Sequence, residues 1–158
     1  MVYLDAETMV YAGLGLLRSK HDLTIVTNTM PTAQKCIELN QNVLFAGGNV
    51  LNRGLRCEGY FTGQMIEQLY FDVSLLCADG LCGQDGVGVL ESQEIETHRK
   101  IIDHSRKNIL VLDRTKFDRQ SVYKFANLDE FDLLITNPLD PDLRRQIEDK
   151  MEILEVEN

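Results

Sequence analysis

Residues 71–100, FDVSLLCADGLCGQDGVGVLESQEIETHRK, decide the fold of this chain. The apolar run 73–78 is too short for a typical helix and predicts a buried strand. It ends in Asp79 and Gly80, which open a glycine-rich loop, and a polar helix follows. In open α/β sheets, ligands bind at the carboxyl ends of strands, where loops diverge and helix N-termini present free N–H groups. Asp79 is therefore expected at such an end.

Length and composition limit the class of protein. The chain has 158 residues, of which 44% are hydrophobic, and this suits one compact domain over residues 1–158. No apolar stretch approaches the roughly 20 residues of a transmembrane helix, and the N-terminus lacks the pattern of a signal peptide. A cytoplasmic protein without membrane contact is expected.

Charge and cysteine content exclude further classes. The net charge of −9 argues against direct binding to nucleic acid, which needs clustered Lys and Arg. Cys36, Cys57, Cys77 and Cys82 show no CxxC spacing and are interpreted as buried reduced thiols rather than disulfides or metal ligands. Since metal-ligand spacing, GxGxxG and P-loop patterns are also absent from the sequence, neither a metal nor a cofactor is expected.

Strand and helix patterns alternate along the chain. Strands are predicted at residues 2–5, 23–26, 43–46, 73–78, 109–112, 133–135 and 153–156, the last at a sheet edge. Helices are predicted at residues 8–20, 31–39, 61–69, 92–107 and 140–150. Residues 49–60 break the alternation and are interpreted as an extended connection or irregular strand. The alternation predicts βαβ units and a parallel sheet.

Polar residues follow several of these strands: Asp5 with Thr8, Thr27 with Asn28, Asp79, and Asp113 with Thr115 and Lys116. If the strands are parallel, these residues meet at one edge of the sheet. Hydroxyls and helix N-termini there suit a phosphate, Lys116 can pair with it, and the carboxylates can hold sugar hydroxyls. Taken singly, each residue is better explained as the cap of a following helix; taken together, they favour a shared site.

Glu94 and His98 lie four residues apart on the predicted helix 92–107. Ser92 is its expected N-cap, and Glu94 lies in the first turn, where the helix dipole favours acids. The pair Glu94 and His98 can serve as acid and base, because an imidazole titrates near neutral pH. The more frequent alternative is a buried histidine with satisfied hydrogen bonds.

Four motifs, TNT at 27–29, GG at 47–48, ADG at 78–80 and VLDRTKF at 111–117, carry a family resemblance. Over nearly its whole length the chain resembles the C-terminal effector domain of DeoR-family transcriptional repressors. The family's segments read approximately LDxGTT, TNS, GG, GxDG, an E-x-x-x-K helix and DxSKF, in the same order. The resemblance implies a three-layer α/β/α fold with a mostly parallel sheet, shared with ribose-5-phosphate isomerase, glucosamine-6-phosphate deaminase and coenzyme A transferases.

The resemblance also implies a function, namely binding of a phosphorylated sugar or related metabolite that alters operator binding and oligomer state. A homo-oligomer is expected, and DNA is contacted only through the family's N-terminal winged helix-turn-helix, which this chain lacks, so a fragment is expected. The implied ligand-binding residues are Asp5, Ala6, Glu7, Thr8, Thr27, Asn28, Thr29, Gly47, Gly48, Asp79, Gly80, Glu94, His98, Asp113 and Lys116.

The chain departs from the family pattern at Glu7 in place of Gly, Met9 in place of Thr, and His98 in place of Lys, where a permanent charge is removed. A carboxylate a few Å from a phosphate costs about 1 to 4 kcal/mol, so this first loop is less suited to a dianion. Two alternatives to a sensor remain. One is a sugar-phosphate isomerase-like enzyme in which Glu94 or Asp79 moves a proton, which the departures disfavour. The other is a purely structural oligomerisation domain.

Overall fold

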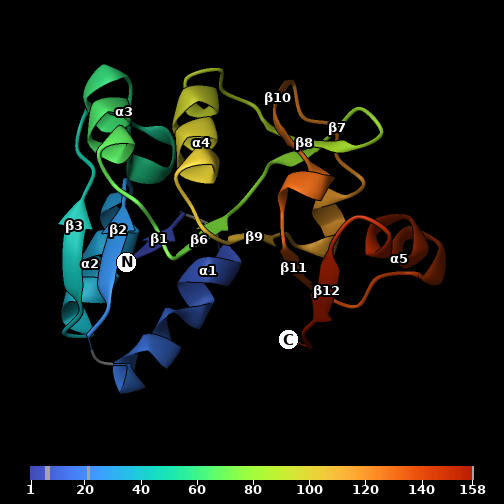
Figure 1. The fold of residues 1–158 in the computed structure, drawn as a ribbon, viewed down its shortest axis with the longest axis horizontal. Coiled ribbons are helices and arrows are strands. Elements are labelled where there is room, and N and C mark those ends of the chain that lie inside the picture. The colour runs from blue at the N-terminus through green and yellow to red at the C-terminus, as the bar shows by residue number, and fades with distance from the viewer. Residues whose placement is uncertain (6–7, 21, 158) are drawn as a thin grey trace.

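A seven-stranded parallel sheet forms the centre of the molecule in the computed structural model, which describes residues 1–5, 8–20 and 22–157 (Figure 1). Its strands, in spatial order, are β12 (Glu152–Glu155), β11 (Leu133–Thr136), β9 (Asn108–Val111), β6 (Val73–Leu76), β1 (Val2–Leu4), β2 (Thr24–Thr27) and β3 (Asn42–Phe45). Neighbouring strands pair in parallel. The seven strands predicted from the sequence are these seven, with ends shifted by one or two residues, and β12 lies at an edge as expected.

Helices cover both faces of the sheet, which confirms the predicted α/β class. Helix α1 (Thr8–Gly13) and α2 (Met30–Glu38) lie on one side, and α3 (Tyr60–Glu67) and α4 (Glu94–Asp103) lie on the other (Figure 1). Successive strand residues alternate between two buried clusters, as period-2 geometry requires. Tyr3 packs in the cluster with α3 and α4, whereas Leu4 packs in the cluster with α1 and α2.

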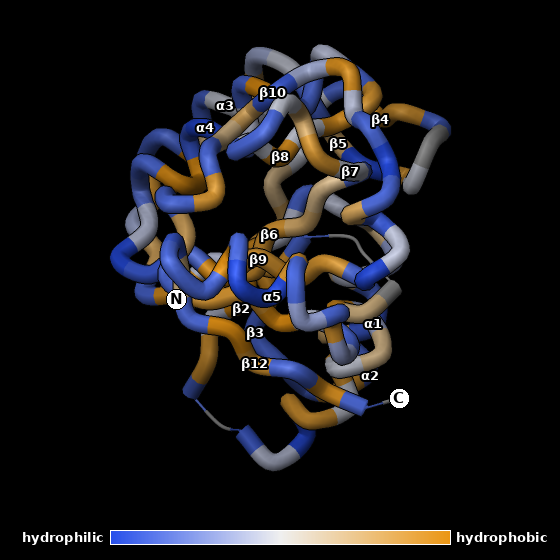
Figure 2. Tube along the Cα trace, turned by 90° about the vertical axis from the view of Figure 1, so that its right-hand side faces the viewer, coloured by the Kyte–Doolittle hydropathy of each residue, from blue (hydrophilic) through white to orange (hydrophobic). Residues whose placement is uncertain are grey.

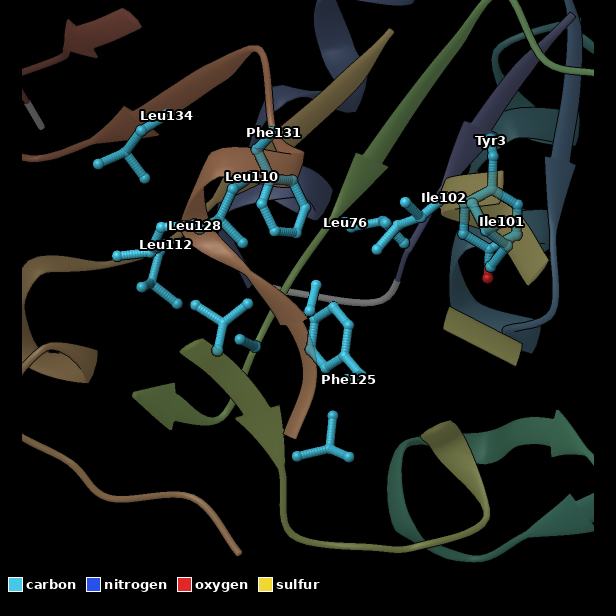
Figure 3. Close-up of a cluster of buried hydrophobic side chains, with 14 of the residues drawn as sticks. Tyr3, Leu76, Ile101, Ile102, Leu110, Leu112, Phe125, Leu128, Phe131 and Leu134 are labelled. Atoms are coloured by element: carbon cyan, nitrogen blue, oxygen red, sulfur yellow. The ribbon is translucent and has the colours of Figure 1, made fainter. Parts of the chain in front are cut away.

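The larger of the two clusters joins the sheet to the C-terminal part of the chain. Leu110 and Leu112 lie close to Leu128 and Phe131 (Figure 3). The cluster also includes Ile147 of α5 (Pro141–Glu148). Apolar segments are concentrated through the middle of the molecule, and hydrophilic segments lie mostly around it (Figure 2).

The glycine-rich segment after Asp79 is not the loop that the sequence predicts. It forms β7 (Gly80–Cys82) and β8 (Gly86–Val89), which pair with β10 (Tyr123–Asn127) in a three-stranded antiparallel sheet. The glycines allow close backbone approach, because a Cβ on Gly80 would lie 2.5 Å from the Arg119 carbonyl oxygen. Glycine content therefore reflects sheet packing here rather than a ligand loop.

Residues 49–60, interpreted as irregular, contain a β-hairpin. Its strands are β4 (Asn49–Leu51) and β5 (Arg56–Glu58), and the short 3-10 turn η2 (Arg53–Leu55) connects them. The turn contains Gly54 at φ +71° and Leu55 at φ +49°. Three-residue strands with residues of mixed polarity carry too little periodicity to be recognised in the sequence.

The helix boundaries differ from the predicted ones at several ends. The predicted helix 8–20 divides into α1 and the 3-10 segment η1 (Leu14–Ser19). Helix α4 begins at Glu94 and ends at Asp103, so Ser92 is not its N-cap, although Glu94 and Glu96 occupy its first turn as expected. Helix α5 begins with Pro141 behind Asp140, whose carboxylate accepts the N–H groups of Asp142 and Leu143.

The cysteines and the apolar character of the helices also relate to the sequence predictions. All four cysteines are free thiols, and Cys82 is the half-buried one among them. Within residues 1–5, 8–20 and 22–157, no helix combines the length and apolar character needed to cross a membrane.

Gly48 offers a test of how tightly β3 and its following turn pack on α3. A Cβ on Gly48 would overlap Thr62 Oγ1 and approach the Glu58 carbonyl oxygen to 3.0 Å, whereas a Cβ on Gly47 would meet nothing within 4 Å. We expect Gly48→Ala to lower the free energy of unfolding by about 1 to 3 kcal/mol through overpacking. Urea titration measures this change.

Gly47→Ala is the matched control and should change stability by less than about 0.5 kcal/mol. Equal effects of the two substitutions would contradict the packing described for Gly48.

Candidate functional site

The candidate site lies where the topology reverses. From β1 the chain proceeds to β2 and β3 on one side, then returns to β6 on the other side of β1. The connections leaving the carboxyl ends of β1 and β6 therefore diverge, and such a switch point is where open α/β sheets bind ligands. A cavity of about 310 Å³ occupies this place. Its lining residues are Asp5, Gly54, Arg56, Cys77, Ala78, Asp79, Val89, Glu94, His98 and Lys116.

Asp5 forms the floor of this pocket. Its side chain is buried immediately after β1, and Oδ2 accepts the Cys77 N–H at 3.1 Å, which joins the two diverging strand ends. The same oxygen lies 3.1 Å from His98 Nε2, and Oδ1 lies 3.2 Å from a terminal nitrogen of Arg56. A buried carboxylate needs such compensation, because an unpaired buried charge is costly.

Arg56 connects two acids across the pocket. One terminal nitrogen of its guanidinium contacts Asp5, and the other contacts the carboxylate of Glu94 at the start of α4. Burial alone lowers the pKa of Arg56, but Asp5 and Glu94 raise it above its ordinary value. Arg56 is therefore a permanent cation that holds β1, the β4–β5 hairpin and α4 together.

His98 is a buried pocket residue on α4, one turn after Glu94. Its Nδ1 is 2.8 Å from the Glu94 carbonyl oxygen, and its Nε2 faces Asp5. Both ring nitrogens thus face acceptors, which favours the doubly protonated imidazolium. Burial opposes the charged form, but the hydrogen bond and charge of Asp5 prevail and raise the pKa of His98. The contacts of His98 therefore favour the charged form of its ring, although a histidine stands where the family pattern has a lysine.

Glu94 and His98 do not form the predicted acid–base pair of side chains. The Glu94 carboxylate is directed to Arg56, whereas His98 contacts the main-chain oxygen of Glu94. Burial raises the pKa of Glu94, and the nearby charges of Arg56 and His98 oppose this rise. The buried, hydrogen-bonded histidine, which was the alternative interpretation, is the one observed.

Asp79 and Lys116 complete the ring of charged side chains. Asp79 follows β6, and its Oδ2 accepts the Leu90 N–H at 2.9 Å, so it also fixes the connection after β8. Lys116 ends the 3-10 turn η3 (Arg114–Lys116) after β9. Together with Asp5 and Glu94, Asp79 supplies acceptors for hydroxyl groups, while the cations Arg56, His98 and Lys116 can pair with an anionic group.

The structure does not direct the TNT motif into this pocket. The Asn28 amide donates to the Cys57 carbonyl oxygen at 2.9 Å and to Glu58 Oε1 at 3.1 Å, and its Oδ1 accepts the Tyr3 hydroxyl at 2.9 Å. The hydroxyls of Thr27 and Thr29 lie 3.2 Å apart, and both side chains are buried. These residues connect β2 to the hairpin and are absent from the pocket lining.

Other predicted residues also have structural roles. The Gly47 carbonyl oxygen accepts the Thr62 hydroxyl at 3.0 Å, Gly48 packs against Thr62, and Gly80 packs against Arg119. Asp113 caps η3 by accepting the Thr115 N–H at 2.8 Å. This is the role expected when Asp113 is considered singly, as the cap of a following helix. Ala6 and Glu7 lie outside the described residues, as does the side chain of Thr8.

Glu58 forms a second buried acidic position behind the pocket. Its side chain is 2% exposed, accepts a hydrogen bond from Asn28 and contacts the Thr97 hydroxyl. Burial raises the pKa of Glu58 to about 7, although Thr97, His98 and Arg56 act in the opposite direction. This carboxyl group therefore changes its charge near neutral pH inside the protein.

Sequence reasoning missed Arg56 and Glu58. They lie two residues apart on β5, so both side chains point to the same face of the hairpin and into the protein. Their burial depends on acceptors and donors directly after β1 and β2 and on α4, which are 30 to 51 residues away in the sequence. The alternation of charged residues around Cys57 is a signal too short to have identified them. Among the described residues, no cluster of acids, histidines and cysteines suits a metal ion.

The raised pKa of Glu58 predicts a pH dependence of stability. The folded chain retains the Glu58 proton up to about pH 7, whereas the unfolded chain releases it near the ordinary glutamate pKa of 4.5. The free energy of unfolding should therefore fall as the pH rises through this window and level off above it. Glu58→Gln keeps a neutral amide there, so it should gain up to about 3 kcal/mol relative to wild type between pH 4.5 and 8.

Denaturant titrations of both proteins across this pH range measure the difference. Glu148→Gln, an exposed position on α5, is the control and should follow wild type at every pH. A difference between Glu58→Gln and wild type that does not vary with pH would show that Glu58 titrates normally.

Comparison with known proteins identifies the family of the chain. The model of the DeoR C terminal sensor domain matches residues 1–138, which include every pocket residue named above. The chain is 28% identical over 153 residues to the HTH-type transcriptional regulator GolR of Listeria innocua, a match that covers 94% of this chain and 59% of GolR.

Two Escherichia coli proteins are also similar. The glycerol-3-phosphate regulon repressor of strain K12 is 26% identical over 141 residues, covering 89% of this chain and 56% of the repressor. The putative aga operon transcriptional repressor of O157:H7 is 26% identical over 137 residues, covering 86% and 51%. The chain thus spans about half the length of the curated relatives it matches, and it belongs to the DeoR C terminal sensor domain family.

Proposed function

We propose that this chain is the ligand-sensing part of a DeoR-type transcriptional repressor and that its pocket binds a phosphorylated sugar or a related hydroxyl-rich anion. The observation that carries the proposal is the convergence of Asp5, Arg56, Asp79, Glu94, His98 and Lys116 at the switch point of the sheet. Carboxylates suit sugar hydroxyls, and the three cations suit a phosphate or carboxylate group. One relative is named a repressor of the glycerol-3-phosphate regulon, which supports the same ligand class.

In the whole regulator, we expect effector binding to change operator affinity. A ligand acts in this way when it binds one conformational state more tightly and so shifts the population of the DNA-binding form. The relatives are named transcriptional regulators, several of them of the HTH type, and the net charge of −9 argues against direct DNA contact by this chain. Association of subunits into a homo-oligomer is part of the proposal. Helix-turn-helix proteins commonly bind as symmetric dimers, because their operators consist of two symmetry-related half-sites.

An isomerase-like enzyme is the less supported hypothesis. The matched relatives are named as transcriptional regulators and repressors. Asp5 and Glu94 are paired with Arg56, so the guanidinium occupies carboxylate oxygens that a general base would need for the proton of a substrate. Incubation with ribose 5-phosphate, followed by NMR, should show the sugar unchanged.

Ligand binding can be tested by thermal unfolding in the presence of ribose 5-phosphate, glucosamine 6-phosphate and glycerol 3-phosphate. At a concentration about 100 times the dissociation constant, a ligand of the folded state adds about 2.7 kcal/mol of stability, which raises the Tm by about 5 to 10 °C. Lys116→Ala should abolish this shift without unfolding the protein, because it removes a pocket cation from a half-buried position.

Lys107→Ala is the matched control, since it removes the same charge from the amino-terminal edge of β9. It should leave the shift intact. Unphosphorylated ribose and glycerol should give no shift at the same concentrations. A flat response of the wild-type chain to a broad panel of sugar phosphates and sugar acids would refute the proposed ligand class.

A further inference from the structure

The β4–β5 hairpin is exposed along most of its length but sends Arg56 into the pocket. Val50 and Leu55 are 48% and 47% exposed, whereas the side chain of Arg56 is 13% exposed. The hairpin therefore contacts the site through a charged group rather than through apolar packing. Such a segment has few interactions to break when it moves.

One end of the hairpin is firmly attached. The Cys57 N–H donates to the Asn28 carbonyl oxygen at 2.7 Å, and the Asn28 amide donates back to the Cys57 carbonyl oxygen at 2.9 Å. Next to this double link, Glu58 contacts Asn28 and Thr97. Residues 57–58 are also paired with Val50 and Asn49 of β4, so these four residues form a fixed base from which residues 51–56 extend.

The other end carries an unusual backbone conformation. Leu55, directly before Arg56, has φ +49°, a region that a residue with a bulky side chain rarely adopts. Such conformations persist where the surroundings hold them, and they are frequent at switch segments and ligand sites. The ion pairs of Arg56 with Asp5 and Glu94 restrain the backbone next to Leu55.

An anionic ligand would compete for this same group. A phosphate or carboxylate presents oxygens to both terminal nitrogens of a guanidinium, and these nitrogens are the ones that now contact Asp5 and Glu94. Asp5 would still be compensated after losing Arg56, because it accepts the Cys77 N–H and faces His98. The change of partners is therefore feasible without leaving Asp5 uncompensated.

We propose that Arg56 both selects an anionic effector and transmits its binding to the β4–β5 hairpin. The effector's anionic group binds the guanidinium, the bridge from Arg56 to Glu94 opens, and residues 51–56 reorient relative to the fixed base formed by residues 57–58 and their partners on β4. This inference rests on the proposed ligand-sensing function of the same pocket. It assigns the ligand-responsive surface of the sensor to the exposed side of the hairpin.

The contacts of Arg56 with Asp5 and Glu94, which hold the hairpin in place, are called the latch. Hydrogen–deuterium exchange of the 158-residue chain tests this latch before any ligand is known. Arg56→Gln should increase the exchange rate of the amides of residues 51–56 about tenfold or more, since it removes two charge-assisted contacts. Arg56→Lys keeps one positive charge but cannot bridge both acids, so it should lie between Arg56→Gln and wild type.

Arg99→Gln is the matched control, because Arg99 likewise bridges two acids, Asp103 and Glu130, outside the pocket. It should leave exchange in the hairpin at the wild-type rate. Wild-type hairpin exchange in both folded Arg56 variants would overturn the latch.

Ribose 5-phosphate and glycerol 3-phosphate then serve as probes. A probe that raises the Tm of wild type should also change exchange at residues 51–56, and Arg56→Gln should weaken its binding about 10- to 100-fold and abolish that change. Binding by wild type without any change in the hairpin would refute the transmission but leave the sensor function intact. Failure of every sugar phosphate and sugar acid to bind wild type would refute the sensor function, while the ligand-free comparison would still decide the latch.

Discussion

The burial of the Asp5 carboxylate is the constraint on which the site depends. An acid placed directly after the central strand β1 leaves water on folding, and the loss of hydration must be compensated by donors from elsewhere in the chain. The compensation comes from the Cys77 N–H after β6, from Arg56 on the hairpin and from His98 on α4. One carboxylate therefore fixes the positions of elements that are 51 to 93 residues away in the sequence.

A second buried network supports the first. Asn28, at the end of β2, connects Tyr3 of β1 with Cys57 and Glu58 of β5, and Glu58 in turn contacts Thr97 in the turn of α4 that precedes His98. The hairpin base is thus held by amide and hydroxyl groups and by the Glu58 carboxyl group, whereas the pocket residues are held by ion pairs to Arg56. This division explains why the TNT motif is near the site without lining it. It also distinguishes residues 57–58 of the hairpin, which contact Asn28 and Thr97, from Arg56, which contacts Asp5 and Glu94.

The position of the pocket follows from topology more than from any single motif. The reversal of strand order between β1 and β6 opens a space at the carboxyl edge, and Asp5 and Asp79 follow those two strands. All of the pocket residues fall within the range 1–138 that matches the DeoR C terminal sensor domain. Helix α5 and strand β12 lie beyond that range, and they extend the sheet at the edge away from the hairpin.

The sequence by itself determined the seven parallel strands, the helices between them, and the acids at the strand ends, because these depend on local apolar runs, breaks and capping residues. The strand ends predicted Asp5, Asp79 and Lys116 as neighbours together with Thr27, Asn28 and Asp113, and the family resemblance added Glu94 and His98. Only the tertiary structure decided that the glycine-rich segment is a sheet, that Thr27, Asn28 and Asp113 serve the framework, and that Arg56 is the central cation. The physical reason is that a buried charge is compensated by groups from distant parts of the chain, which are brought together only by the fold. A short strand such as β5 has no local pattern from which its buried charged residues can be recognised.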